Sequence, residues 1–189
     1  MKHFIFNKNL SFEKHSNFEV AMFGMGCFWG AEKKFWELPG VELTAVGYAG
    51  GITKNPSYQA VCSGTTGHNE VVKIVFNQNV LTFDDILLVF WENHNPTQGN
   101  RQGNDIGSQY RSGAYFYNEK QRHSILNSMK SYEKQLSTHG FGKITTEVKK
   151  APLFYIAEDY HQQYLAKNPG GYCGLGGTGI NLTQNAINC

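Results

Sequence analysis

The pattern of apolar and polar positions near the start of the chain predicts a strand, a helix and a second strand. Residues 18–24 are largely apolar and run into a glycine turn, which is typical of a buried strand. Apolar residues then recur at helical spacing from Cys27 to Leu38, and Pro39 with Gly40 ends that pattern. Residues 41–49 are again largely apolar. The opening therefore predicts a βαβ unit.

Strands and helices continue to alternate along the rest of the chain. Thr82 and Asp85 have the spacing of a capping box, and the helix that follows is apolar almost all round, so it should be well buried. Asn118 and Gln121 cap a longer helix, whose expected core stripe is Ile125, Met129, Tyr132 and Leu136. The elements expected after the βαβ unit are a glycine-containing loop at 50–68, a strand at 70–76, a helix at 82–93, a polar loop at 94–113, a strand at 114–117, a helix at 118–137, strands at 144–148 and 153–156, and a helix at 158–167.

The C-terminal segment, from about residue 168, differs from the rest in composition. Six glycines lie between Gly170 and Gly179, and we expect this tail to lack regular structure. No internal repeat or domain boundary is visible, so residues 1–189 are expected to form one domain, large enough to bury a core.

Composition and charge restrict the classes of function. Hydrophobic residues make up 40% of the chain and charged residues 17%, which is typical of a globular protein. The formal net charge is only +2 and no basic stripe occurs, which argues against a nucleic-acid partner. No apolar run has the length of a membrane span, and Asn7, Lys8 and Asn9 interrupt any signal-peptide core. We expect a cytoplasmic protein.

Two of the four cysteines lie in settings that suggest redox chemistry. Cysteines at 27, 62, 173 and 189 form neither a CxxC pair nor a zinc-type spacing, and Cys62 is expected to be a small buried hydrophobe. Cys27 opens a helix, where backbone N–H groups and the helix dipole favour the thiolate; a buried capping cysteine is the alternative. The neighbouring Phe28 and Trp29 are either core residues or the walls of an apolar cup.

A second thiol and a set of proton donors complete the candidate site. Cys173 lies among glycines in GGYCGLGGTG, so it belongs either to a mobile arm able to reach an oxidised Cys27 or to a tightly wound tail. Glu70 opens an apolar strand, where burial would raise its pKa and make it a proton donor. Tyr58 and Tyr110, in polar loops, are further donors or ordinary rim residues.

Six stretches of the chain carry motifs that occur together in one known family. The stretches are GCFWG at 26–30, GYAGG at 47–51, NPSYQAVCSGTTGHNE at 55–70, FWENHNPTQGNRQGNDIGSQYRS at 90–112, AEDYHQQYLAKNP at 157–169 and GYCGLGGTG at 171–179. Over about residues 18 to 180 the chain resembles the A type of peptide methionine sulfoxide reductase, the class that acts on the S epimer of methionine sulfoxide. The resemblance implies an α+β fold, a two-layer sandwich with a mixed sheet and a ferredoxin-like core.

The resemblance also implies a role for each candidate residue. The roles are Cys27 as nucleophile, Phe28 and Trp29 as the cradle of the substrate methyl group, Glu70 as the acid that protonates the oxygen, Tyr58 and Tyr110 as hydrogen-bond donors to it, Asp105 as a supporting carboxylate, and Cys173 as the resolving cysteine. Many relatives carry a further cysteine eight or nine residues beyond the resolving one, where this chain has Asn181 and Leu182. Cys189 either replaces it in recycling or is idle.

The implied reaction is the reduction of free or protein-bound methionine-S-sulfoxide, in the repair of oxidised proteins. It passes through a Cys27 sulfenic acid and a Cys27–Cys173 disulfide, which thioredoxin reduces. The resemblance implies no metal or organic cofactor, no nucleic-acid or membrane partner, and a monomer.

Two other functions remain open from the sequence. A cysteine acyl hydrolase would need His161 or His68 within hydrogen-bond reach of Cys27. A module that binds methionine-rich peptides through its aromatic loops would need no reactive thiol. His68 and His94 lack partners at metal-ligand spacing, so we expect them to have loop or hydrogen-bonding roles.

Overall fold

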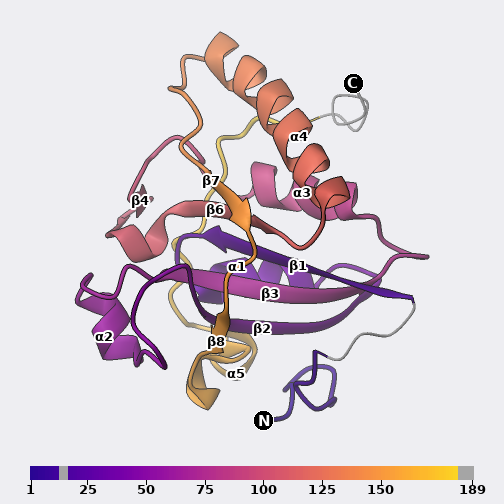
Figure 1. The fold of residues 1–189 in the computed structure, drawn as a ribbon, viewed down its shortest axis with the longest axis vertical. Coiled ribbons are helices and arrows are strands. Elements are labelled where there is room, and N and C mark those ends of the chain that lie inside the picture. The colour runs from indigo at the N-terminus through magenta and orange to yellow at the C-terminus, as the bar shows by residue number, and fades with distance from the viewer. Residues whose placement is uncertain (13–16, 183–189) are drawn as a thin grey trace.

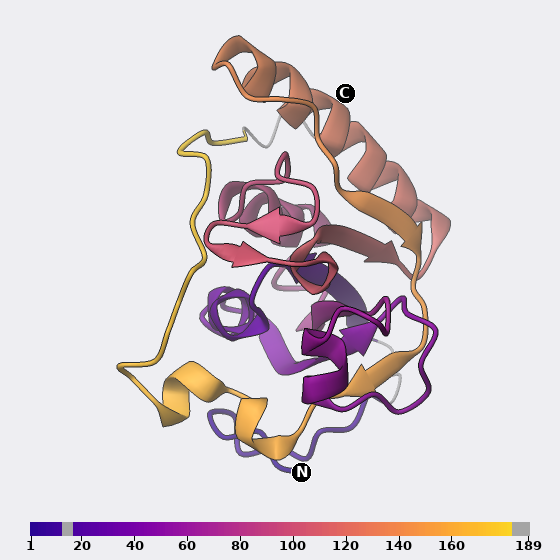
Figure 2. The same ribbon diagram turned by 90° about the vertical axis from the view of Figure 1, so that its left-hand side faces the viewer.

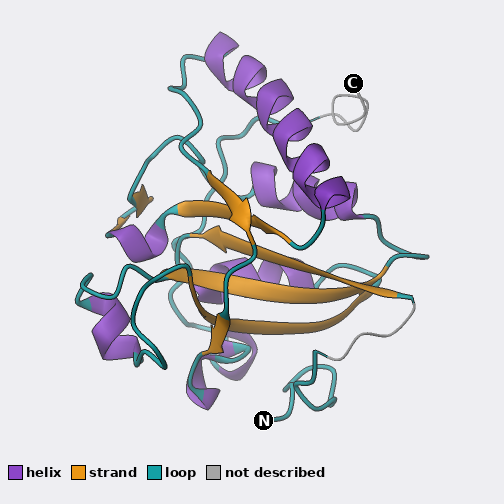
Figure 3. Cartoon of the chain, in the orientation of Figure 1, coloured by secondary structure: helices purple, strands orange, loops and turns teal. Residues whose placement is uncertain are grey.

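The computed structural model describes residues 1–12 and 17–182, and its centre is a curled, mixed six-stranded sheet in the order β7-β6-β1-β3-β2-β8 (Figures 1 and 3). The strands of this sheet are β1 (Phe18–Met25), β2 (Val41–Ala49), β3 (Asn69–Asn77), β6 (Ser112–Phe116), β7 (Glu147–Lys150) and β8 (Phe154–Ile156). The helices are α1 (Phe28–Trp36), α2 (Tyr58–Cys62), α3 (Phe83–Glu92), α4 (Glu119–Thr138) and α5 (Tyr164–Lys167). A small hairpin of β4 (Arg101–Gln102) and β5 (Asp105–Ile106) lies apart from the sheet, with 3₁₀ turns η1 (Ser108–Tyr110) and η2 (Asp159–His161).

The strand pairing gives the predicted βαβ unit a split form. Strands β1 and β2 both pair with β3 in antiparallel fashion, so β1 and β2 run parallel to each other with β3 between them. Strands β6 and β8 add in antiparallel fashion outside β1 and β2, and β7 pairs with β6 in parallel. The final residues of β1 and the first residues of β3 therefore lie side by side, where the polar side chains of the site gather.

Helices α1, α3 and α4 cover one face of the sheet (Figures 1 and 2). Their apolar side chains share one cluster with alternate residues of β1 and β3, as the period-two orientation of strand side chains requires. In α4 the predicted stripe holds: Ile125, Tyr132 and Leu136 are fully buried and Met129 packs against the same cluster from a half-buried position. The sheet and these helices form two layers.

The predicted helix starts agree with the observed caps. The Thr82 hydroxyl accepts the backbone N–H of Asp85, whose carboxylate accepts the Thr82 N–H in return, which completes the capping box of α3. The Asn118 side chain accepts the Gln121 N–H at the start of α4. These ends depend on local hydrogen bonds, and for that reason local sequence predicts them well.

The prediction of one continuous helix at 158–167 is wrong. The chain forms the turn η2, breaks at Gln162 and Gln163, and resumes as the single turn α5. Gln163 is left-handed, with φ of 47°, and the Gln162 side chain forms hydrogen bonds with the backbone of Val46. Both glutamines are buried, so their bonds to other segments outweigh local helix propensity.

Three smaller expectations also fail. The loop expected at 50–68 contains helix α2, capped by the Ser57 hydroxyl, which accepts the Ala60 N–H. Cys62 ends that helix and is exposed, so it is not the buried hydrophobe that its size suggested. The strand expected at 144–148 begins only at Glu147.

Residues 168–182 contain no helix or strand, and in Figure 2 this segment runs from α5 past α1 towards the top of the molecule. Of the helices in residues 1–12 and 17–182, none combines the length and the apolar character that a membrane span requires.

Candidate active site

Cys27 lies in the sharp turn between β1 and α1. Gly26 has φ of +89°, a conformation that favours glycine, and it turns the chain away from the sheet so that Cys27 becomes the N-cap of α1. The Cys27 side chain makes no capping hydrogen bond, and the first turn of α1 contains no acidic residue. The orphan N–H groups of this helix must therefore find an acceptor elsewhere.

Glu70 of the neighbouring strand β3 supplies that acceptor. Its Oε2 accepts the backbone N–H of Phe28 at 3.0 Å, and its side chain is almost fully buried. Burial raises the pKa of Glu70 to about 8; the Phe28 N–H opposes the shift and the charge of Asp105 contributes to it. At neutral pH the carboxyl is therefore mostly protonated, beside the residue that follows Cys27.

The structure corrects the expectation that the helix N-terminus would make Cys27 a thiolate at rest. Burial raises the pKa of the Cys27 thiol well above its usual range, and the nearby Glu70 contributes in the same direction. The backbone N–H groups of Trp29 and Gly30 lower the pKa but do not outweigh the burial. Desolvation disfavours the charged form, so both Cys27 and Glu70 hold their protons in the resting site.

Aromatic residues from two segments build an apolar wall next to Cys27. The Trp29 ring stacks on Tyr164 of α5, with ring centres 3.9 Å apart and planes at 15°, and the Trp29 indole N–H donates to His161 Nδ1 at 3.0 Å. Phe28 is buried, and its ring lies 5.9 Å from Tyr48 and 5.2 Å from His161. The rings are thus held rigidly against one another, as a pocket for a small apolar group requires.

Tyr58 and Tyr110 approach the same carboxyl group from helix α2 and turn η1. Burial raises the pKa of each phenol, and the charge of Glu70 raises both further, as does that of Cys27 for Tyr110. Both hydroxyls therefore keep their protons, and the Tyr58 hydroxyl also forms a hydrogen bond with the Cys62 side chain. Tyr58 and Tyr110 thus share the electrostatic environment of Glu70.

Asp105 lies in the hairpin of β4 and β5. It adds to the electrostatic environment of Cys27 and Glu70, raising the pKa of each. Its two carboxylate oxygens accept the hydroxyl of Tyr172, a residue of the tail, at 3.3 and 3.4 Å. The hairpin thus brings a half-buried carboxylate to the edge of the site.

The tail brings Cys173 to the first turn of α1. A methyl group at Gly30 would lie 3.0 Å from the Cys173 sulfur, so the tail passes directly over that turn. Cys27 and Cys173 are free thiols, and Cys173 is exposed. Cys189 lies outside the described residues.

The three histidines weighed at the sequence level have hydrogen-bonding roles. His94 contacts the Phe90 carbonyl and the Ser112 hydroxyl, and His68 contacts the backbone of Gly51 and Thr53. These contacts confirm the expected roles of His68 and His94. The Nδ1 of His161 is taken by Trp29, so neither candidate general base is seen bonded to Cys27. In the part of the chain that the structure describes, no three His, Cys, Asp or Glu side chains converge as metal ligands.

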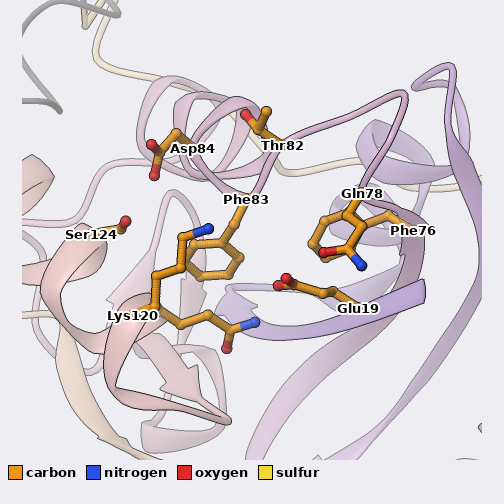
Figure 4. Close-up of a pocket in the computed structure, with 9 residues that line it drawn as sticks. Glu19, Phe76, Gln78, Thr82, Phe83, Asp84, Lys120 and Ser124 are labelled. Atoms are coloured by element: carbon orange, nitrogen blue, oxygen red, sulfur yellow. The ribbon is translucent and has the colours of Figure 1, made fainter. Parts of the chain in front are cut away.

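A pocket of about 190 Å³ lies at the other end of β1, between α3 and α4 (Figure 4). Phe83 and Lys120 point into it from the two helices, and Glu19 lies on the strand side. Glu19 and Cys27 are eight residues apart along an extended strand, roughly 25 Å. This pocket is therefore separate from the thiol site.

Sequence reasoning missed three residues that the structure adds to the site. Tyr164 stacks on Trp29, Tyr172 bonds to Asp105, and Glu158 accepts the Tyr58 backbone N–H at 2.9 Å and the Tyr48 hydroxyl at 2.8 Å. The AEDYHQQYL stretch contains two of them, but reading it as one regular helix hid their orientation. Only the break at Gln163 places the Tyr164 ring over Trp29.

These features define a thiol-based enzyme site, with a buried proton donor beside a half-buried cysteine and an aromatic wall. The family described as Peptide methionine sulfoxide reductase matches residues 19–184. A relative from Synechocystis, peptide methionine sulfoxide reductase MsrA 1, is 59% identical over 179 residues, which is 95% of this chain and 81% of the relative. The human mitochondrial peptide methionine sulfoxide reductase is 60% identical over 163 residues, covering 86% of this chain and 69% of the human protein.

Solved structures agree with the sequence comparison. Methionine sulfoxide reductase A of Corynebacterium diphtheriae superposes with a TM-score of 0.84 at 44% identity, covering 90% of this chain and 83% of that chain. Yeast Mxr1 in complex with Trx2 shares the fold, with a TM-score of 0.54 at 19% identity over 82% of this chain and 91% of that one. The chain belongs to the peptide methionine sulfoxide reductase family. It is an oxidoreductase of the MsrA type, which reduces methionine sulfoxide.

Proposed function

We propose that the chain reduces methionine-S-sulfoxide, free or in proteins, through a sulfenic acid at Cys27 and a disulfide between Cys27 and Cys173. The observation that carries this proposal is the Glu70 carboxyl, fully buried and hydrogen-bonded to the Phe28 N–H directly after the nucleophile. Its pKa of about 8 keeps a proton available at neutral pH. A sulfoxide oxygen leaves sulfur only when it is protonated, and the Glu70 carboxyl can supply that proton.

In the first step the Cys27 sulfur attacks the sulfoxide sulfur while Glu70 gives its proton to the oxygen. The attack forms a bond between the two sulfurs, and the thiol proton of Cys27 passes to the Glu70 carboxylate. The S–O bond of the substrate and the new S–S bond then break as the hydroxyl group transfers to the Cys27 sulfur, so methionine and a sulfenic acid are the products. The sulfoxide sulfur is reduced by two electrons and the cysteine sulfur is oxidised by two. Tyr58 and Tyr110 would hold the substrate oxygen, and Phe28 with Trp29 would hold its methyl group.

In the second step Cys173 attacks the Cys27 sulfenic sulfur. An S–S bond forms as the S–O bond breaks, and the oxygen leaves with protons as water. A dithiol of the thioredoxin type then reduces the disulfide by exchange. The fold that the chain shares with yeast Mxr1, solved in complex with Trx2, supports this choice of reductant. Two alternatives stay open for Cys189: it accepts the disulfide from Cys173 and passes it to the reductant, or it takes no part.

The arrangement of strands also supports a finer description of the fold. Helix α1 connects two parallel strands that have β3 inserted between them, which is the split βαβ of ferredoxin-like folds. We propose that this unit is the core of a single domain.

A single-turnover experiment without external reductant tests the proposed reaction. Reduced protein is mixed with a peptide that contains methionine-S-sulfoxide or its R epimer, and mass spectrometry follows both product and protein. We expect one methionine per enzyme from the S epimer, and a Cys27–Cys173 linkage. Cys27→Ser is the control and should form no methionine.

Three results would contradict the proposal. If the Cys173→Ser variant never carries an oxygen atom on Cys27 after methionine release, the sulfenic acid is not an intermediate. If the wild type forms its linkage with Cys189 directly, Cys173 is not the resolving residue. Methionine formation that survives in Cys27→Ser would show that Cys27 is not the nucleophile.

A further inference from the structure

We propose that Gly177 and Leu175 dock the tail on the helix layer and thereby hold Cys173 over the first turn of α1. Both would act as positioning residues for disulfide formation. This inference rests on the proposed function, and it concerns only the second step of that reaction. The evidence is a series of close contacts along residues 171–182.

Gly177 makes the closest of these contacts. Its backbone lies against the carbonyl group of Glu92, at the end of α3, so closely that a methyl group at Gly177 would overlap the carbonyl oxygen and lie 3.0 Å from the carbonyl carbon. The atoms in the way belong to a helix backbone, which moves far less readily than the end of a flexible side chain. Only glycine allows the tail to approach here.

Gly176 offers a matched comparison one residue away. A methyl group at Gly176 would have no heavy atom within 4 Å. A change to alanine would stiffen the chain to the same degree at either position. Only at Gly177 would the added methyl group also collide with α3.

Leu175 docks the tail by a different kind of interaction. Its side chain packs, partly buried, against the main hydrophobic cluster, and a methyl group at Gly30 of α1 would lie 3.0 Å from the Leu175 Cβ. The same position is 3.0 Å from the Cys173 sulfur. Gly30 thus leaves room for both tail residues on the surface of α1.

Hydrogen bonds fasten the tail on both sides of these residues. Beyond Gly177, the Leu182 N–H donates to the Glu92 carboxylate at 2.8 Å, and the Tyr132 hydroxyl donates to the Ile180 carbonyl at 3.0 Å. Before it, Tyr172 bonds to Asp105. The segment that contains Cys173 is therefore held at two ends, as Figure 2 shows for its path from α5 past α1.

The position of Gly30 explains why this docking matters for chemistry. Cys27 is the N-cap of α1, and Gly30 lies three residues further on, in the first turn of that helix. The Cys173 sulfur thus lies against the turn that Cys27 opens, and docking keeps it there. A docked thiol has a higher effective concentration than one on a free flexible tether, which is about millimolar.

The test separates the two steps of the reaction. Gly177→Ala, Leu175→Ala and the control Gly176→Ala each undergo one turnover with methionine-S-sulfoxide and no reductant, with rapid quenching. Methionine release, Cys27 sulfenic acid trapped by dimedone, and the Cys27–Cys173 disulfide are followed by mass spectrometry. We expect methionine release at the wild-type rate in all three variants, because none of these residues touches the substrate.

Disulfide formation should distinguish them. We expect it to slow about tenfold in Gly177→Ala and in Leu175→Ala, with sulfenic acid accumulating, and to stay unchanged in Gly176→Ala. Disulfide formation at the wild-type rate in both docking variants would overturn the inference, and so would an equal slowing in Gly176→Ala. Absence of methionine in the wild type would instead refute the proposed function. A variant that merely unfolds would lose methionine release as well, and the second docking variant then decides.

Discussion

Because the pKa of Glu70 is raised, we expect the free energy of unfolding to depend on pH, and this can be measured without any assay of turnover. Glu70→Gln keeps an oxygen to accept the Phe28 N–H but removes the ionisable group. In the wild type the folded carboxyl has a pKa of about 8, raised from its ordinary value of 4.5. Between these two values the unfolded chain has lost the proton while the folded protein keeps it.

The sign and size of the effect follow from linkage. The unfolded state binds fewer protons in this window, so the wild type loses about 1.4 kcal/mol of stability per pH unit from this group as pH rises. From pH 5 to pH 8 the loss is about 4 kcal/mol, and it ends above pH 8, where both states are ionised. Glu70→Gln lacks this slope, so it should gain stability relative to the wild type across the window.

Urea unfolding of both proteins at pH 5, 6, 7 and 8 measures the difference. The other groups are the same in the two proteins. The way in which the difference between their free energies of unfolding varies with pH therefore reports on Glu70. Glu37→Gln, an exposed residue at the end of α1, serves as the control and should show no such change. A difference between wild type and Glu70→Gln that is the same at pH 5 and pH 8 would refute a protonated Glu70. Methionine release by the wild type should also decline as pH rises through about 8, since only the protonated carboxyl donates.

Three further predictions concern other parts of the site. Trp29→Phe removes the indole donor of His161, and we expect KM to rise about fivefold, or ~1 kcal/mol, in steady-state assays; an unchanged KM would contradict a role in substrate binding. Glu32→Ala leaves the buried Gln163 N–H without its acceptor at 2.7 Å and should destabilise the fold by about 3 kcal/mol in urea unfolding, a loss that a merely peripheral residue would not cause. Cys62→Ser alters an exposed thiol and should leave the single-turnover disulfide unchanged by mass spectrometry; loss of the disulfide would implicate Cys62.

Elements with local determinants could be predicted from the sequence. Helices α3 and α4 begin where Thr82 and Asn118 provide caps, and β2 has the bounds that its apolar run predicts. The segment at 158–167 could not be predicted, because Gln162 and Gln163 form hydrogen bonds with residues more than a hundred positions away. Such partners have no signature in the local pattern.

The sequence by itself determined the chemistry-bearing residue types and the family. Its motifs placed Cys27 after a glycine turn, Glu70 on a strand and Cys173 in a glycine-rich tail. The tertiary structure decided their protonation and their mutual approach. Burial beside a carboxyl keeps the Cys27 thiol protonated, although a cysteine at a helix N-terminus viewed alone should ionise. The loss of solvent around a group depends on every segment that packs against it, including segments far away in the sequence. The local sequence pattern contains information only about neighbours along the chain.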